Sequence, residues 1–336
     1  MAANMGMWTR RQALMGMAAV PLLGTMEAAA QSWDDVVKRA TAEGKVTLYS
    51  VAPPEQGERL VAAFQKKYPS IKVTIVRGVV ELITRLNAER ASGVDGGDVF
   101  LYSDPGWFKE NAQHLLELDT PAAKAFPSKY WAAPGKAPLV SFPPMGMLVW
   151  NRQKVPGGLK SYADFLNPAY NGRLGTRGDM TAVNAAFLEW LEQTFGADYL
   201  RKLGGQKPKF YPSVVPLTQA VAAGEVWMAN ISVPSIVKDL INQGAPIEYI
   251  IPAPTFAISW AAGAIANSKR PNAALLLTDF IMTREGQAAL NGEGDAGSPL
   301  DVKGALAMND LAVVDLAQYM GAKREEWTKK FKEYFQ

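Results

Sequence analysis

Residues 45–102 read KVTLYSVAPPEQGERLVAAFQKKYPSIKVTIVRGVVELITRLNAERASGVDGGDVFLY. Three short segments of this stretch are rich in β-branched and aromatic residues and are bounded by glycine or proline, as strands are. The two segments between them repeat apolar residues at helical spacing. We therefore expect strands at 45–51, 71–77 and 98–102, and helices at 55–68 and 79–92. Strands that alternate with helices in this way are typical of a parallel sheet covered by helices.

The loops that follow these strands form the expected ligand-binding edge. In open α/β sheets, ligands bind beyond the carboxyl ends of the strands. The loops there are polar or contain glycine, and they lie at 52–56, 78–81 and 102–107. The candidate ligand-binding residues at this edge are Val79, Tyr102, Ser103 and Asp104. Any α/β sheet has such loops, so the alternative interpretation is that they are ordinary connections that bind no ligand.

A second group of alternating elements follows the first. We expect its strands at 171–176, 209–211, 225–231 and 247–251, and its helices at 181–195, 214–223 and 233–243. Residues 137–150 contain three prolines, which favours a strand that passes from the first group to the second. Residues 256–266 are expected to form the crossing by which the chain returns to the first group.

Both groups together predict an α/β protein of two lobes, each a mixed sheet covered by helices, joined by crossing strands. The chain has 336 residues, which favours two lobes because single hydrophobic cores stop growing beyond about 250–300 residues. We expect the first lobe at 31–140 together with about 256–295 and the second at 150–252. The C-terminal helices of 300–336 are expected to pack on either lobe.

Composition excludes several classes of partner and site. Apolar residues make up 48% of the chain and charged residues 20%, as in soluble globular proteins. The 35 basic and 32 acidic residues are too balanced to favour a nucleic-acid partner. The chain has no cysteine, so a disulfide framework and a thiolate metal site are both excluded.

Residues 1–30 are typical of an export signal. Arg10 and Arg11 precede an apolar run at 13–26, which is too short to span a bilayer, since a spanning helix needs about 20 residues. Three alanines end at Ala30, where we expect cleavage. Residues 9–14 (TRRQAL) resemble the twin-arginine motif, and an ordinary secretory signal is the alternative. We therefore expect a soluble periplasmic protein without a lipid anchor.

Several stretches, in their order and spacing, resemble family 1 of the extracellular solute-binding proteins. They are residues 45–78, 82–104 (LITRLNAERASGVDGGDVFLYSD), 146–151 (GMLVWN), 164–176 (DFLNPAYNGRLGT), 272–291 (NAALLLTDFIMTREGQAALN) and 297–304 (GSPLDVKG). The matching branch holds periplasmic ferric-iron-binding proteins and relatives that bind thiamine, phosphonates or polyamines. The resemblance implies a type II-like, two-lobed periplasmic binding protein. It further implies a monomer that closes on a small-molecule ligand and delivers it to an ABC transporter permease in the inner membrane.

The resemblance also bears on the class of ligand. Iron-binding relatives use adjacent tyrosines in the second lobe, often with a histidine and a carboxylate from the first. The matching region here, at 224–234 (GEVWMANISVP), has no tyrosine, and the only histidine is His114. Indole, thioether and amide groups are poor ligands for ferric iron, which prefers hard oxygen donors. We therefore expect no metal or cofactor and take Asn230 and Ser232 as candidate ligand-binding residues, with a ferric-iron receptor as an alternative.

Arg177 is the strongest sign of an anionic or zwitterionic organic ligand. It lies between a predicted strand and the start of a predicted helix, where free N–H groups and the helix dipole favour an anion. A guanidinium there can pair with a carboxylate or phosphonate, with Asp179 and Thr181 beside it. The alternative is that Asp179 or Thr181 caps the helix and Arg177 pairs with Asp179. Aromatic residues that suit the walls of a pocket are Tyr102, Trp107, Trp227, Phe256 and Trp260.

The sequence does not favour catalysis. Residues 292–297 (GEGDAG) match the dinucleotide fingerprint G-x-G-x-x-G, but they follow a predicted helix and precede Ser298-Pro299, so we interpret them as a turn. A G-x-S-x-G motif is absent. Carboxylates such as Glu55, Glu81 and Asp104 leave an exported hydrolase as a second alternative. We expect no enzyme.

Overall fold

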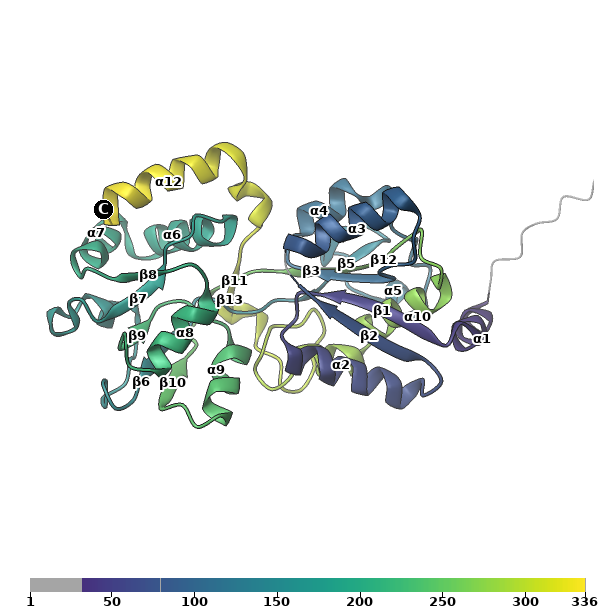
Figure 1. Ribbon diagram of the computed structural model, residues 1–336, viewed down its shortest axis with the longest axis horizontal. Coiled ribbons are helices and arrows are strands. Elements are labelled where there is room, and N and C mark those ends of the chain that lie inside the picture. The colour runs from purple at the N-terminus through teal and green to yellow at the C-terminus, as the bar shows by residue number, and fades with distance from the viewer. Residues whose placement is uncertain (1–31, 79, 336) are drawn as a thin grey trace, which may run out of the picture. The chain divides into compact units, whose positions relative to one another are not determined.

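Two sheets covered by helices form the framework of the protein in this computed structural model (Figure 1). The structure describes residues 32–78 and 80–335, so the expected export signal and the candidate Val79 lie outside the described residues. Trp33–Gln336 form one compact unit. Within the described residues, no helix is long and apolar enough to cross a membrane.

The first sheet has six strands in the order β2-β1-β3-β12-β5-β4. Their bounds are β1 (Lys45–Ser50), β2 (Lys72–Arg77), β3 (Val99–Tyr102), β4 (Trp131–Ala133), β5 (Ala137–Ser141) and β12 (Trp260–Ala264). β1, β2 and β3 are parallel, whereas β12, β5 and β4 pair antiparallel. β3 and β12 are buried along their whole length. Strands covered on both faces are continuous apolar runs, and the sequence of β3 is of this kind.

Helices cover both faces of the first sheet. They are α1 (Trp33–Glu43), α2 (Pro54–Lys67), α3 (Val80–Ser92), α4 (Pro105–Glu110), α5 (Pro121–Ala125), α10 (Pro271–Met282) and α11 (Arg284–Asn291), with a 3-10 turn at Ala112–His114. Adjacent residues of a strand point to opposite faces. Leu48 of β1 therefore packs in one cluster with Leu60 of α2, and Tyr49 packs in another with Leu82 of α3.

The second sheet has five strands in the order β10-β6-β9-β7-β8. Their bounds are β6 (Leu148–Asn151), β7 (Leu174–Arg177), β8 (Lys209–Tyr211), β9 (Met228–Ala229) and β10 (Ile247–Ile250). β9, β7 and β8 are parallel, and β6 pairs antiparallel with β9 and β10. The helices here are α6 (Ala182–Phe195), α7 (Ala197–Gly205), α8 (Val214–Ala222) and α9 (Pro234–Asn242), with 3-10 turns at Tyr162–Leu166 and Pro168–Tyr170.

The chain passes between the two sheets three times. It leaves the first sheet after β5 and enters the second at β6, and it returns between β10 and β12. The first crossing lies in the segment at 137–150 that the sequence predicts. The return occupies residues 251–259 and overlaps the predicted segment at 256–266 only in part. The third crossing contains β13 (Leu311–Val313), which pairs in parallel with β11 (Thr255–Ala257) and was not predicted.

The C-terminal segment packs on the second lobe. α12 (Gly321–Phe335), yellow in Figure 1, lies beside α6 and α7. It follows 3-10 turns at Met308–Asp310 and Leu316–Tyr319. Trp327 of α12 is fully buried, and its indole Nε1 donates a hydrogen bond of 2.6 Å to Oε2 of Glu189.

One predicted strand is much shorter than expected. The sequence predicts a strand over 225–231, but β9 contains only Met228 and Ala229. Asn230 to Ser232 leave the sheet, and the Ser232 N–H donates to the carbonyl of Met145 in the first crossing segment, 3.0 Å away. A contact with the crossing chain thus replaces sheet pairing at this point.

Candidate functional site

The carboxyl edge of the first sheet gathers residues from five strands. Because β1, β2 and β3 are parallel, Ser50, Arg77 and Tyr102 end at the same edge. β12 runs the opposite way, with Ala261 opposite Tyr102, so Trp260 also lies at this edge. Trp260 in turn pairs with Ser141, the last residue of β5. The register therefore places the predicted Tyr102 and Trp260 at the same edge but on opposite faces of the sheet, since Tyr102 packs in one cluster with Ala261 and Trp260 packs in the other. It also adds Ser141, which no sequence pattern singled out.

Tyr102 ends β3, and Ser103 and Asp104 lead from it into α4. The Tyr102 ring stacks on Phe100, with ring centroids 4.9 Å apart. Burial, together with the nearby Asp104 and Glu81 carboxylates, raises the pKa of Tyr102, so its hydroxyl stays protonated. Oδ1 of Asp104 accepts from the N–H groups of Gly106 (2.9 Å) and Trp107 (3.2 Å). Asp104 therefore caps α4, with Ser103 half-buried beside it.

Two buried polar atoms at this edge lack a partner in the described part of the chain. They are Oγ of Ser141, a fully buried residue, and Nε1 of Trp260, which is 6% exposed. Buried polar groups are normally hydrogen-bonded to protein, water or ligand. These two atoms thus have hydrogen-bonding capacity that the described part of the chain does not use.

Arg77 is a second residue at this edge that the sequence analysis missed. It is exposed at the end of β2, and its Nε donates to the carbonyl of Ala52, 3.1 Å away. No carboxylate of residues 32–78 or 80–335 forms an ion pair with it. Its position at the end of a predicted strand, before the predicted 78–81 loop, is the signal that would have found it.

The second sheet has a corresponding edge. Asn230 follows β9, and Arg177 and Tyr211 end the parallel strands β7 and β8. Asn230 is 1% exposed, and neither its Oδ1 nor its Nδ2 has a partner among the described residues. Ser232 is also buried, and its hydroxyl forms a hydrogen bond of 2.7 Å with that of Thr218. Of these two predicted residues, Asn230 is the one with unused hydrogen-bonding groups.

Arg177, Asp179 and Thr181 come together as an internal ion pair and cap. Nε of Arg177 donates to Oδ1 of Asp179 at 2.8 Å, and Nη2 bonds to the other carboxylate oxygen and to Oγ1 of Thr181 at 3.2 Å. Thr181 also accepts from the Asn184 N–H and so caps α6. This is the arrangement that the sequence left open as the alternative to an anion site. A ligand carboxylate would compete with Asp179 for the guanidinium of Arg177, which is 8% exposed.

A comparison with known families decides the identity. Residues 50–288 match the family model described as bacterial extracellular solute-binding protein. The chain belongs to this family. A search of curated proteins found no match to this solute-binding protein.

Solved structures share its fold. The substrate-binding protein of an ABC transporter from Agrobacterium tumefaciens is 16% identical with a TM-score of 0.71, and the match covers 87% of this chain and 94% of that one. Iron-bound HitA from Pseudomonas aeruginosa is 20% identical with a TM-score of 0.62, over 86% and 99%. AfuA from Actinobacillus pleuropneumoniae, solved with exogenous fructose-6-phosphate, is 20% identical with a TM-score of 0.63, over 87% and 99%. The fold prediction, a two-lobed α/β binding protein, is confirmed.

The remaining aromatic candidates of this solute-binding protein lie in its core or beside it. Trp107 packs edge to face on Phe100 with centroids 4.9 Å apart, and Phe256 is fully buried in the return crossing. The centroid of the Trp227 ring lies 5.1 Å from Cζ of the Arg173 guanidinium. Among the described residues, no three of the His, Asp and Glu side chains are placed to hold a metal ion.

Proposed function

We propose that this solute-binding protein is the periplasmic receptor of an ABC importer. Its two lobes close on a small anionic or zwitterionic organic molecule and deliver it to a permease in the inner membrane. The observation that carries the proposal is the set of buried groups without partners in the described chain at the two sheet edges: the Trp260 indole, the Ser141 hydroxyl and the Asn230 amide. A solute that pairs with these groups stabilises the lobe arrangement in which it reaches them.

Charge at the edges supports an anionic group on the solute. Arg77 presents a guanidinium that no carboxylate of the described chain neutralises, and guanidinium groups bind carboxylates and phosphonates in bidentate fashion. The Arg177–Asp179 pair presents both signs of charge at the other edge, which suits a zwitterion. The hydroxyl of Tyr102, kept protonated by burial, adds a neutral donor.

The three crossings between the sheets supply the hinge for closure. Hinge motions use a few residues in connecting segments while the packed lobes move as rigid bodies. Export by the signal at residues 1–30, by the twin-arginine route, would place the receptor in the periplasm as a monomer. The structure from Agrobacterium tumefaciens is that of the substrate-binding protein of an ABC transporter, and we extend this role to the present chain.

Thermal unfolding with a panel of small carboxylates, amino acids and phosphonates tests the proposal. A solute at 100 times its Kd adds about 2.7 kcal/mol to the free energy of unfolding, which raises the melting temperature measurably. Titration calorimetry with the best member of the panel then compares the wild type with Trp260→Phe and Arg77→Met. We expect each substitution to weaken binding about tenfold, the effect of one hydrogen bond to a charged group.

Trp131→Phe is the matched control, because Trp131 lies on β4 at the far side of the first sheet. It should leave the affinity unchanged. Native mass spectrometry of the purified protein provides a second measurement, since a tightly held solute is released on unfolding. The proposal is wrong if no member of the panel shifts the melting temperature and no small molecule is released.

A further inference from the structure

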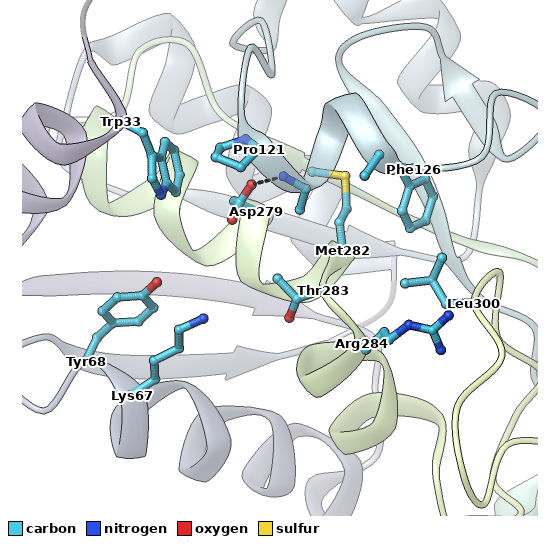
Figure 2. Close-up of a pocket in the computed structure, with 12 residues that line it drawn as sticks. Trp33, Lys67, Tyr68, Pro121, Phe126, Asp279, Met282, Thr283, Arg284 and Leu300 are labelled. Atoms are coloured by element: carbon cyan, nitrogen blue, oxygen red, sulfur yellow. Dashed lines mark hydrogen bonds between the residues drawn. The ribbon is translucent and has the colours of Figure 1, made fainter.

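A hollow of about 560 Å³ opens in the first lobe, away from the sheet edges (Figure 2). It is lined by residues of α1, the C-terminal end of α2, α5, α10, the first turn of α11 and the loop that follows α11. α2 separates the hollow from the carboxyl edge, because Pro54 begins the helix at that edge and Lys67 ends it at the hollow. Fourteen residues of helix span about 20 Å.

The size and walls of the hollow suit a small molecule. Sites for small ligands measure about 300–1,000 Å³ and are lined mainly by apolar side chains. Phe126 and Met282 are buried in the wall, and Trp33 and Leu300 are half-buried there. These four residues come from four separate parts of the chain, and Figure 2 shows them around the same space.

Two cations at the rim have no carboxylate partner in the part of the chain that the structure describes. Lys67 Nζ lies 5.6 Å from the centroid of the Tyr68 ring and 5.9 Å from that of Phe280. Nη1 of Arg284 donates only to the backbone carbonyl of Asp301. Both side chains are exposed to solvent and line the hollow. Their charges are therefore available to an anion that enters it.

Asp279 is the single carboxylate among the residues that line the hollow, and it is already hydrogen-bonded to the start of α5. Its Oδ1 accepts from the N–H of Ala122 at 2.8 Å, and the Thr120 hydroxyl bonds to the same carboxyl group. Burial raises the pKa of Asp279, while the hydrogen bonds from Thr120 and Ala122 and the charge of Lys67 act in the opposite direction. Two cations against one engaged carboxyl group leave the lining with a net positive charge.

We propose that this hollow is a second ligand site, specific for a small amphipathic anion such as a monocarboxylate with an apolar chain or ring. The carboxylate lies between Lys67 and Arg284, and the apolar body packs on Phe126, Met282 and Leu300. The site is separate from the solute-binding edges and does not depend on lobe closure.

Octanoate is the probe that tests the second site, with titration calorimetry as the measurement. The wild type should bind it, and the double variant Lys67→Met, Arg284→Met should bind about tenfold more weakly, since it loses two charge-assisted contacts that solvent screens at these exposed positions. Lys66→Met is the matched control, because it removes the same charge from the adjacent, exposed position of α2. Ala125→Trp, at an exposed lining position, fills the hollow and should abolish binding without altering the charge.

Four results would overturn the second site: no binding of octanoate or benzoate by the wild type, equal binding by the double variant, equal weakening by Lys66→Met, or weakening by Trp260→Phe. The last result would place the probe at the solute-binding edge. Circular dichroism of each variant confirms folding, and Ala125→Trp decides the question if the double variant is unfolded.

Discussion

At the scale of single residues, Arg270 forms charged contacts with two carboxylates of the first lobe. Its Nη atoms reach both oxygens of Asp95 at 2.8 and 2.6 Å, and its Nε donates to Oδ2 of Asp98 at 2.9 Å. Asp98 is fully buried and also accepts from Thr47 and Ser268. The guanidinium thus ties the start of α10 to the strands β1 and β3.

Arg270→Met should destabilise the protein by about 3 kcal/mol, because it leaves the buried carboxylate of Asp98 without its cation. Urea unfolding measures the change. Arg201→Met is the control: Arg201 pairs with Asp198 at 3.0 Å where both side chains are exposed, so its loss should cost less than about 1 kcal/mol. Equal effects of the two substitutions would show that the Arg270 contacts are no stronger than a surface pair.

Asn230 illustrates a conflict between stability and binding. Its amide is buried with no partner in the described chain, which costs free energy in the absence of solute. Asn230→Leu should therefore stabilise the solute-free protein by about 1 kcal/mol in thermal unfolding and weaken solute binding. A loss of stability would instead show that ordered water satisfies the amide.

At the scale of elements, α12 is held on α6 by charged hydrogen bonds. Oε2 of Glu192 accepts from Nζ of Lys330 at 2.8 Å, and Oε1 accepts from the Tyr334 hydroxyl at 2.7 Å. Burial alone would raise the pKa of Glu192, but these two bonds hold it below its usual value. The ionised form is therefore the one that stabilises the docking of α12.

Glu192→Gln should cost about 1 kcal/mol at neutral pH, since the contact is partly exposed. A carboxyl group with a lowered pKa in the folded state stabilises the protein above its unfolded pKa of about 4.5. That contribution is lost as the pH falls through the lower folded value. The wild type and the variant should therefore differ at pH 7 and converge in acid, as measured by urea unfolding. A difference that does not depend on pH would contradict this account.

Most helices and strands can be predicted from local sequence patterns, whereas the residues of the candidate site come together through the register of strand pairing. The sequence predicts β8 to the residue and α2 within one residue of each end, because glycine, proline and apolar spacing mark them. α4 was missed because its six residues are too few to show a period. Ser141 was missed because its place beside Trp260 depends on antiparallel pairing between distant strands. The contact of Arg177 with Asp179 was foreseen only as an alternative, since two readily paired charges also suit a ligand.

At the scale of the whole molecule, contacts between segments far apart in the sequence link the two lobes. The turn at 292–297, which the sequence analysis distinguishes from a dinucleotide site, carries Asp295, which is 3% exposed. Its carboxylate bonds to Nη2 of Arg59 on α2 at 2.5 Å and to Nζ of Lys238 on α9 at 2.8 Å. α2 covers the first sheet and α9 the second, so one buried carboxylate joins cations from both lobes.

Lys238→Met should loosen the coupling between the lobes, because it removes the cation that the second lobe contributes to Asp295. The chain has no cysteine, so spin labels at the exposed positions of Lys66→Cys and Lys202→Cys report one distance between the lobes. Electron-spin resonance should find a broader distance distribution in Lys238→Met than in the wild type. Lys330→Met, which breaks an ion pair within the second lobe, should leave the distribution unchanged. Equal distributions in all three proteins would show that the crossings alone set the lobe arrangement.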